Sequence, residues 1–154
     1  LDLAADVARE HVLAHGSPSY PVRDYTLPRA LRDYVKMRRV FRDMGDGSWV
    51  CFVGHSHVPA VYYAELRLYR PPNRKDEQEV PLEGPYDLGE SRSIINVGSV
   101  GQPRDGDPRL SYVLFDGSNV SFVRLAYDHE RAAQDIKDTN ALPEYLAERL
   151  LIGR

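Results

Sequence analysis

Three histidines that follow apolar runs are the side chains in this sequence best suited to chemistry. His15 closes the apolar run 11–15, and His55 and His57 come directly after the apolar run 49–53. The loop ends of strands in α/β folds are where ligands usually bind. Neutral imidazole is a good ligand for Zn, Mn, Fe or Ni. The positions of these three residues therefore predict a metal site.

The two-residue spacing of His55 and His57 sharpens this prediction. In an extended backbone the two rings leave the same face, and each could serve one of two metals held about 3.5–4 Å apart. Gly54 lets the backbone turn, and Pro59 stops a helix from forming over the pair. Taken alone, a His-x-His pair is more often a surface accident. Two other classes of enzyme with His-x-His pairs fit less well. A cupin would need a Glu and a later His nearby, and an amidohydrolase barrel would need a longer chain.

A glycine-rich segment, residues 96–109, follows the short apolar run 94–95. Such a loop leaving a strand can bring backbone N–H groups close to an anion. By composition alone, an elaborate turn is the better interpretation of this segment.

The elements that must position these residues alternate between strands and helices. Apolar runs predict strands at 11–15, 49–53, 60–69, 94–96, 110–115 and 120–126. We expect helices over Leu1–Arg9, over 128–138 and over 140–151. A further helix is expected to begin with Thr26 as its cap and Pro28 in its first turn, and to end at about Met44. This order predicts an α/β layered fold with mixed sheets.

Composition limits the class of protein. The chain has 154 residues, which fits a single domain over 1–154, and a net charge of −3 without a long basic run. We therefore expect neither nucleic-acid nor membrane-surface binding. The sequence holds one cysteine, Cys51, so a disulfide framework is excluded and a cytoplasmic location is expected. No apolar stretch approaches the roughly 20 residues needed to span a bilayer, and we expect no signal peptide.

Four segments together resemble the calcineurin-like metallophosphoesterase superfamily, in particular its compact bacterial and archaeal phosphodiesterase branch. They are Leu-Ala-His-Gly-Ser-Pro at 13–18, Gly-His-Ser-His-Val-Pro at 54–59, Ile-Asn-Val-Gly-Ser-Val-Gly-Gln-Pro-Arg-Asp-Gly-Asp-Pro at 95–108, and Leu-Pro-Glu-Tyr-Leu-Ala-Glu-Arg-Leu at 142–150. The resemblance spans nearly the whole chain, in the family's order. It implies an αββα sandwich and a phosphodiesterase or phosphatase that uses two divalent metal ions, Mn, Fe, Ni or Zn.

The resemblance also implies roles for individual residues. His15 and His55 match ligands of the second metal, and His57 matches a ligand of the first. The matches of Asn96, Gly98 and Ser99 belong to a loop that lies close to the metal centre, so these residues are expected to shape or support the site.

The family's domain begins with Asp-x-His, Gly-Asp and Gly-Asn-His motifs. The first and the last do not occur in these residues, and the Gly-Asp pairs at 45–46 and 106–107 are not in the strand-to-loop setting that the family's motif requires. We therefore expect the chain to be the C-terminal part of such a domain, without the bridging carboxylate, the Asn ligand and the general-acid His. Alone it should bind at most one metal ion, weakly, and hydrolyse no phosphoester. Absent strands should expose the apolar faces of 50–53 and 12–14, so a second chain or self-association is expected to cover them.

Two alternatives stay open. The chain could serve as a non-catalytic protein-interaction scaffold of the same fold, or it could hold a mononuclear three-histidine site with different chemistry. The number of bound metal ions separates them: two with a partner present favour the phosphoesterase, one tight ion favours the mononuclear site, and none favours the scaffold.

Overall fold

The computed structural model describes residues 4–8, 11–25, 33–71 and 82–154. Their secondary structure comprises, in chain order, β1 (Ala4–Ala8), β2 (His11–Ala14), α1 (Tyr34–Asp43), β3 (Val50–Val53), β4 (Ala60–Tyr63), β5 (Leu68–Tyr69), β6 (Leu82–Asp87), β7 (Ser93–Asn96), β8 (Leu110–Phe115), β9 (Asn119–Leu125), α2 (His129–Asp138) and α3 (Tyr145–Leu151). No helix among these residues is long and apolar enough to cross a membrane.

Six of the strands form a mixed sheet in the order β1-β2-β3-β7-β4-β5. Strands β2, β3 and β7 run parallel to one another, and β4 is antiparallel to β7. The side chains of β7 are all buried, as are those of β3 apart from the half-buried Phe52. Continuous apolar runs of this kind suit strands that are covered on both faces.

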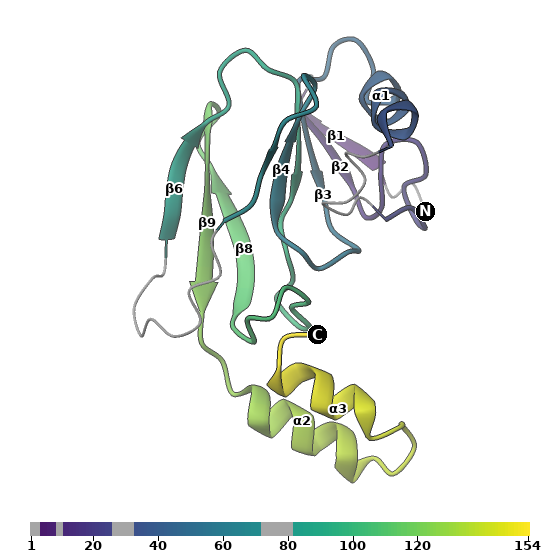
Figure 1. The fold of residues 1–154 in the computed structure, drawn as a ribbon, viewed down its shortest axis with the longest axis vertical. Helices are drawn as coiled ribbons and strands as arrows, with labels where there is room; N and C mark the ends of the chain where they lie inside the picture. The colour runs from purple at the N-terminus through teal and green to yellow at the C-terminus, as the bar shows by residue number, and fades with distance from the viewer. Residues whose placement is uncertain (1–3, 9–10, 26–32, 72–81) are drawn as a thin grey trace.

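Helix α1 covers one face of this sheet (Figure 1). Its N-terminus is capped by the Asp33 carboxylate, which accepts a hydrogen bond from the backbone N–H of Lys36. Met37, Val40 and Phe41 form an apolar stripe at helical spacing and are buried against the sheet.

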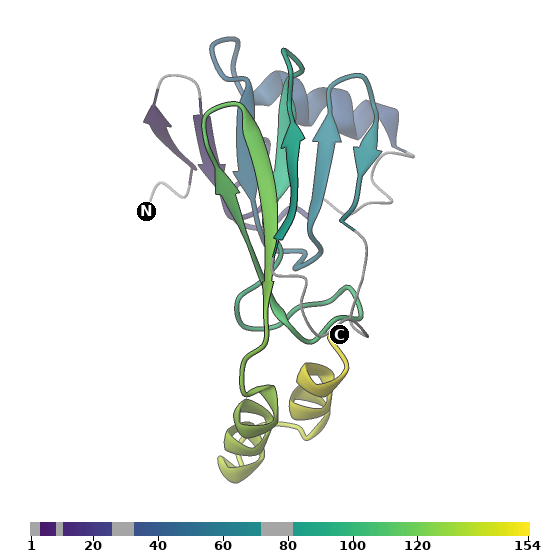
Figure 2. The ribbon, with the colours of Figure 1, turned by 90° about the vertical axis from the view of Figure 1, so that its left-hand side faces the viewer.

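A three-stranded antiparallel sheet, β6-β9-β8, packs against the other face (Figures 1 and 2). The turn at Gly117 joins β8 to β9. Val61 and Ile95 of the first sheet and Val120 and Phe122 of the second belong to one buried core. The predicted α/β layered fold with a mixed sheet is confirmed.

Helices α2 and α3 pack against each other beyond the end of the second sheet (Figure 1). Asp128 caps α2 by accepting from the backbone N–H of Arg131. Ala133, Ala147 and Leu150 are buried between the two helices. This pair is therefore an appendage with its own small core.

Three expectations about local structure need correction. The expected helix over Leu1–Arg9 is wrong, because residues 4–8 form β1, whose backbone pairs with β2. Helix α1 is capped by Asp33, whereas Thr26 and Pro28 lie outside the described residues. The expected exposure of 50–53 is also wrong, because α1 and the second sheet cover β3. In β2, Leu13 is 42% exposed, while Ala14 is buried.

Candidate metal centre

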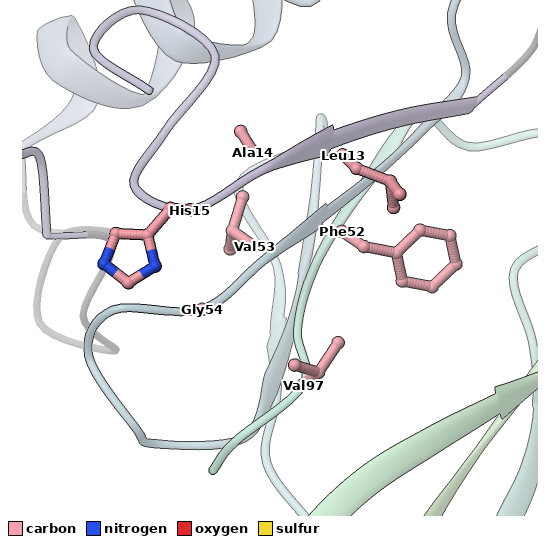
Figure 3. Close-up of a pocket in the computed structure, with 7 residues that line it drawn as sticks. All are labelled: Leu13, Ala14, His15, Phe52, Val53, Gly54 and Val97. Carbon is pink, nitrogen blue, oxygen red and sulfur yellow. The ribbon is translucent and has the colours of Figure 1, made fainter. Parts of the chain in front are cut away.

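The three candidate histidines lie at one end of the parallel strands. His15 follows the last residue of β2, and Gly54 and His55 follow β3, its parallel neighbour. The Gly54 N–H donates to the backbone carbonyl of His15 over 3.1 Å, which ties the two strand ends together (Figure 3). The parallel register thus brings together two loops that are 40 residues apart in the sequence.

The loop after His15 is folded tightly around Gly16. The Gly16 N–H donates to the Pro21 carbonyl, and a Cβ added at Gly16 would lie 2.6 Å from the Tyr20 carbonyl oxygen. No side chain fits at that position. The His-Gly pair therefore has a steric basis, since the glycine lets the loop fold back beside His15.

His15 and His55 are in direct contact. His15 Nε2 lies 2.8 Å from His55 Nδ1, so one imidazole donates a hydrogen bond to the other. The Tyr25 ring lies against His55 with a centroid separation of 4.0 Å. Two imidazole nitrogens on one tetrahedral zinc ion would lie about 3.3 Å apart, given Zn–N distances of about 2.0–2.1 Å. A separation of roughly half an ångström more would let both rings bind one metal ion.

His57 is oriented by a different contact. Its Nδ1 lies 2.7 Å from the Gln102 carbonyl oxygen. A carbonyl can only accept, so Nδ1 must carry the proton, and the lone pair of the neutral ring lies on Nε2. Metal-binding histidines are typically oriented in this way.

The backbone of the histidine loop differs from the expected extended form. His55 and His57 have φ of 57° and 58°, in the left-handed region, so they are not residues of a strand with rings on one face. The buried Ser56 lies between them, and its N–H donates to the Gly54 carbonyl over 2.6 Å. The two rings consequently have different partners, His15 for one and Gln102 for the other.

Asn96, fully buried at the end of β7, holds this unusual backbone in place. Its Nδ2 donates to the Gly54 carbonyl over 2.8 Å and to Ser56 Oγ over 2.7 Å. Its Oδ1 accepts from the Gly98 N–H over 3.1 Å. Asn96 therefore connects the histidine loop to the glycine-rich loop.

Gly98 and Ser99 shape the glycine-rich loop. Gly98 has φ of 83°, and the Ser99 hydroxyl accepts from the N–H groups of Gly101 and Gln102. These contacts place the Gln102 carbonyl against His57. The histidine loop and the Gln102 carbonyl are thus held in place by Asn96, Gly98 and Ser99. The predicted part of these three residues in a functional site stays a prediction.

Two buried ion pairs anchor the far end of the loop. Asp105 pairs with Arg124 of β9, and both side chains are at most 5% exposed. Asp107 pairs with Arg109 over 2.7 Å. Burial alone would raise the pKa of Asp107, but the hydrogen bonds from Arg109 and the charge of Arg124 hold it below its usual value. Sequence reasoning missed Gln102 and Arg124, because their contacts depend on tertiary structure.

An apolar hollow of about 340 Å³ adjoins His15 (Figure 3). Leu13, Phe52 and Val97 form part of its wall. Within the described residues, no three His, Cys, Asp or Glu side chains gather in a group that could hold a metal ion. The structure therefore brings His15 and His55 together, whereas His57, a candidate metal ligand, is oriented separately by Gln102.

The protein environment favours neutral imidazoles. Burial lowers the pKa of His55 below 6.5, and the charges of His15 and Arg104 lower it further. Burial also lowers the pKa of His57, against the hydrogen bond to Gln102, which raises it. Metal ions bind the unprotonated ring. The lone pairs of both residues are therefore available at neutral pH.

The lowered pKa values predict a pH dependence. Because the unfolded chain takes up protons on these rings more readily, their contribution to stability is complete above pH 6.5 and is lost as the pH falls below it. NMR titration of the ring nitrogens should give midpoints below 6.5 for His55 and His57 in the folded chain. The same titration in denaturing urea is the control. Folded midpoints at or above the urea values would contradict the prediction.

The fold of this chain is similar to that of known proteins. No family model matches the chain. A metallophosphoesterase from Sphaerobacter thermophilus superposes with a TM-score of 0.81 and 30% identity, covering all of this chain and 59% of that one. The predicted resemblance to the metallophosphoesterases is confirmed. A hypothetical protein from Pyrococcus horikoshii has the same fold, with a TM-score of 0.65 and 18% identity over 99% of this chain and 50% of that one.

The chain also has a relative in sequence. An uncharacterized protein of Methanocaldococcus jannaschii is 38% identical over 147 residues, which are 93% of this chain and 51% of the relative. The chain thus spans about half the length of the curated relative that it matches. Its metallophosphoesterase-like fold is established, whereas the reaction is a matter of proposal.

Proposed function

We propose that this chain is the C-terminal part of a metallophosphoesterase domain that hydrolyses phosphoesters with two divalent metal ions. The observation that carries the proposal is the paired arrangement of histidine nitrogens at the ends of β2 and β3. His15 Nε2 and His55 Nδ1 converge, and the Gln102 carbonyl fixes His57 in the tautomer that presents Nε2. This arrangement lies on a backbone similar to that of a metallophosphoesterase.

The donor set fits the metals expected for this fold. Imidazole nitrogens suit Mn, Fe, Ni and Zn. His15 and His55 would hold one ion, and His57 would bind the other. When bound, the metal ions would activate a water molecule and offset the charge of the phosphoryl group.

The residues of this chain prepare the site for that chemistry. The Gln102 carbonyl keeps the proton of His57 on Nδ1, and Asn96 holds the backbone between His55 and His57. Three neutral imidazoles bring no negative charge to two divalent cations. We therefore propose that carboxylate and amide ligands and the general-acid His come from a second segment, which also covers Leu13 and the hollow beside His15.

Two further points belong to the same proposal. Phosphomonoesters and phosphodiesters are the proposed substrate class, because the metal pair acts on the phosphoryl group that both share. A cytoplasmic location is proposed because the single cysteine, Cys51, is a free and buried thiol, whose pKa burial raises to about 12. Such a thiol is inert and forms no structural disulfide.

Metal titration tests the proposal directly. Calorimetric titration with Mn²⁺ or Zn²⁺ should give at most one weakly bound equivalent for the chain alone. Replacing His55 with Ala should lower the affinity at least as much as the loss of a residue that orients a ligand, which costs about 10–100-fold. His129→Ala is the matched control, because His129 contacts the Tyr127 carbonyl at the start of α2.

Activity is tested by restoring the proposed second segment. The part of the Sphaerobacter metallophosphoesterase that this chain does not cover is expressed as a second polypeptide together with this chain. We expect two bound metal ions and hydrolysis of bis(p-nitrophenyl) phosphate, both lost in His55→Ala. Hydrolysis by the chain alone would contradict the proposed division of the site. Absence of metal binding by either sample would instead favour the non-catalytic scaffold.

A further inference from the structure

Arg104 lies in the glycine-rich loop beside the candidate histidines. Its backbone N–H donates to the His57 carbonyl over 3.1 Å. Its guanidinium is half-buried and donates from Nε and Nη2 to the side-chain oxygen of Gln102, over 3.2 and 2.6 Å. Gln102 thus contacts both residues, with its backbone carbonyl on His57 and its amide oxygen on Arg104.

The guanidinium of Arg104 differs in its partner from those of the other arginines near this loop. Arg109 pairs with Asp107, and Arg124 pairs with Asp105. In the part of the chain that the structure describes, Arg104 forms no ion pair with a carboxylate. A half-buried guanidinium held by one neutral amide oxygen keeps most of its capacity to bind an anion.

The carboxylates near the histidines have cationic partners of their own. The Asp24 carboxylate accepts from Ser17 and pairs with Lys36. Asp105 and Asp107 pair with Arg124 and Arg109. The Arg104 guanidinium, held beside His57 through Gln102, is therefore a positive group that an incoming anion would meet in this loop.

We propose that Arg104 binds the phosphoryl oxygens of the substrate, an assignment that rests on the proposed phosphoesterase function. The planar guanidinium matches two oxygens of a phosphate with parallel N–H groups. Gln102 holds the guanidinium beside His57 before substrate arrives. On binding, the neutral amide oxygen gives way to the charged phosphate, which is the stronger acceptor.

Arg104 could instead have a purely structural role, in which it only holds the Gln102 side chain in place, and this role makes a different prediction. The Gln102 carbonyl that orients His57 and the backbone N–H of Arg104 both belong to the main chain. Arg104→Gln therefore leaves the orientation of His57 intact. Under the proposal the variant loses phosphate binding and keeps metal binding. If the role of Arg104 is only structural, phosphate binding and metal binding should either both weaken or both stay unchanged.

Phosphate titration of the whole chain tests the assignment. Inorganic phosphate is added to ¹⁵N-labelled wild type, Arg104→Gln and Arg104→Lys, and binding is followed by the shifts of backbone amides in the loop. We expect Arg104→Gln to weaken phosphate about tenfold or more, and Lys to restore part of the loss without the bidentate geometry. Arg67→Gln is the matched control, because Arg67 lies over the Tyr63 ring and is 65% exposed.

The outcomes separate the two proposals. Unchanged phosphate affinity in Arg104→Gln, or no phosphate binding by wild type, overturns the assignment of Arg104. Metal titration of the same samples tests the phosphoesterase function independently, because Arg104 is not a metal ligand. In the reconstituted enzyme, Arg104→Gln should raise KM for p-nitrophenyl phosphate with metal affinity unchanged. An unchanged KM in an active enzyme would also overturn the assignment.

Discussion

Replacing Asp105 with Ala should lower the free energy of unfolding by about 3–5 kcal/mol, because it leaves the Arg124 guanidinium buried without its carboxylate partner. Both side chains are at most 5% exposed, so water cannot replace the lost interaction in the folded chain. Urea denaturation followed by the fluorescence of Trp49, the single tryptophan, measures the change.

Two variants accompany this measurement. The exposed pair between Arg131 and Asp135 of α2 is the control, and Arg131→Ala should leave the urea midpoint unchanged. Replacing both Asp105 and Arg124 with Leu and Met removes both charges together and should recover most of the lost stability. A single Asp105→Ala variant as stable as wild type would show that the buried pair does not hold the loop.

The second large effect is expected at Gly98. An added Cβ would lie 2.6 Å from Ser111 Oγ, and the residue has φ of 83°, which L-residues rarely adopt. Strain in the left-handed region and overpacking together predict a loss of about 2–5 kcal/mol for Gly98→Ala. Because the loop carries Gln102, metal affinity should fall with stability.

Gly101 offers a matched control in the same loop. A Cβ at Gly101 meets nothing within 4 Å, so Gly101→Ala should change neither unfolding nor metal binding measurably. Equal urea midpoints for Gly98→Ala and wild type would show that the loop adjusts freely. The loop would then be too soft to orient His57 through Gln102.

The sequence predicted the features that depend on local pattern. Apolar runs indicated β3 and β7, and the helix expected over 128–138 corresponds to α2. The three histidines were singled out because each follows an apolar run, and the structure indeed places them at strand ends. Parallel pairing of β2 with β3 then accounts for the contact between His15 and His55.

Other features depend on contacts between distant residues and could not be predicted. The left-handed backbone at His55 and His57 is held by Asn96, about 40 residues later. The partner of Asp105, a loop residue, proved to be Arg124, 19 residues away on β9. Residues 4–8 have helical spacing of small apolar side chains, yet they pair with the free edge of β2. Tertiary contacts outweighed local preference in each case.

The position of β7 has a consequence for how the protein folds. This strand lies between β3 and β4, although both precede it in the sequence. The histidine loop joins β3 to β4, so its ends cannot be set correctly until the later strand has inserted between them. Contacts between such distant segments form late, after the entropy of closing a long loop has been overcome. The candidate site is therefore expected to be among the last parts of the chain to become ordered during refolding.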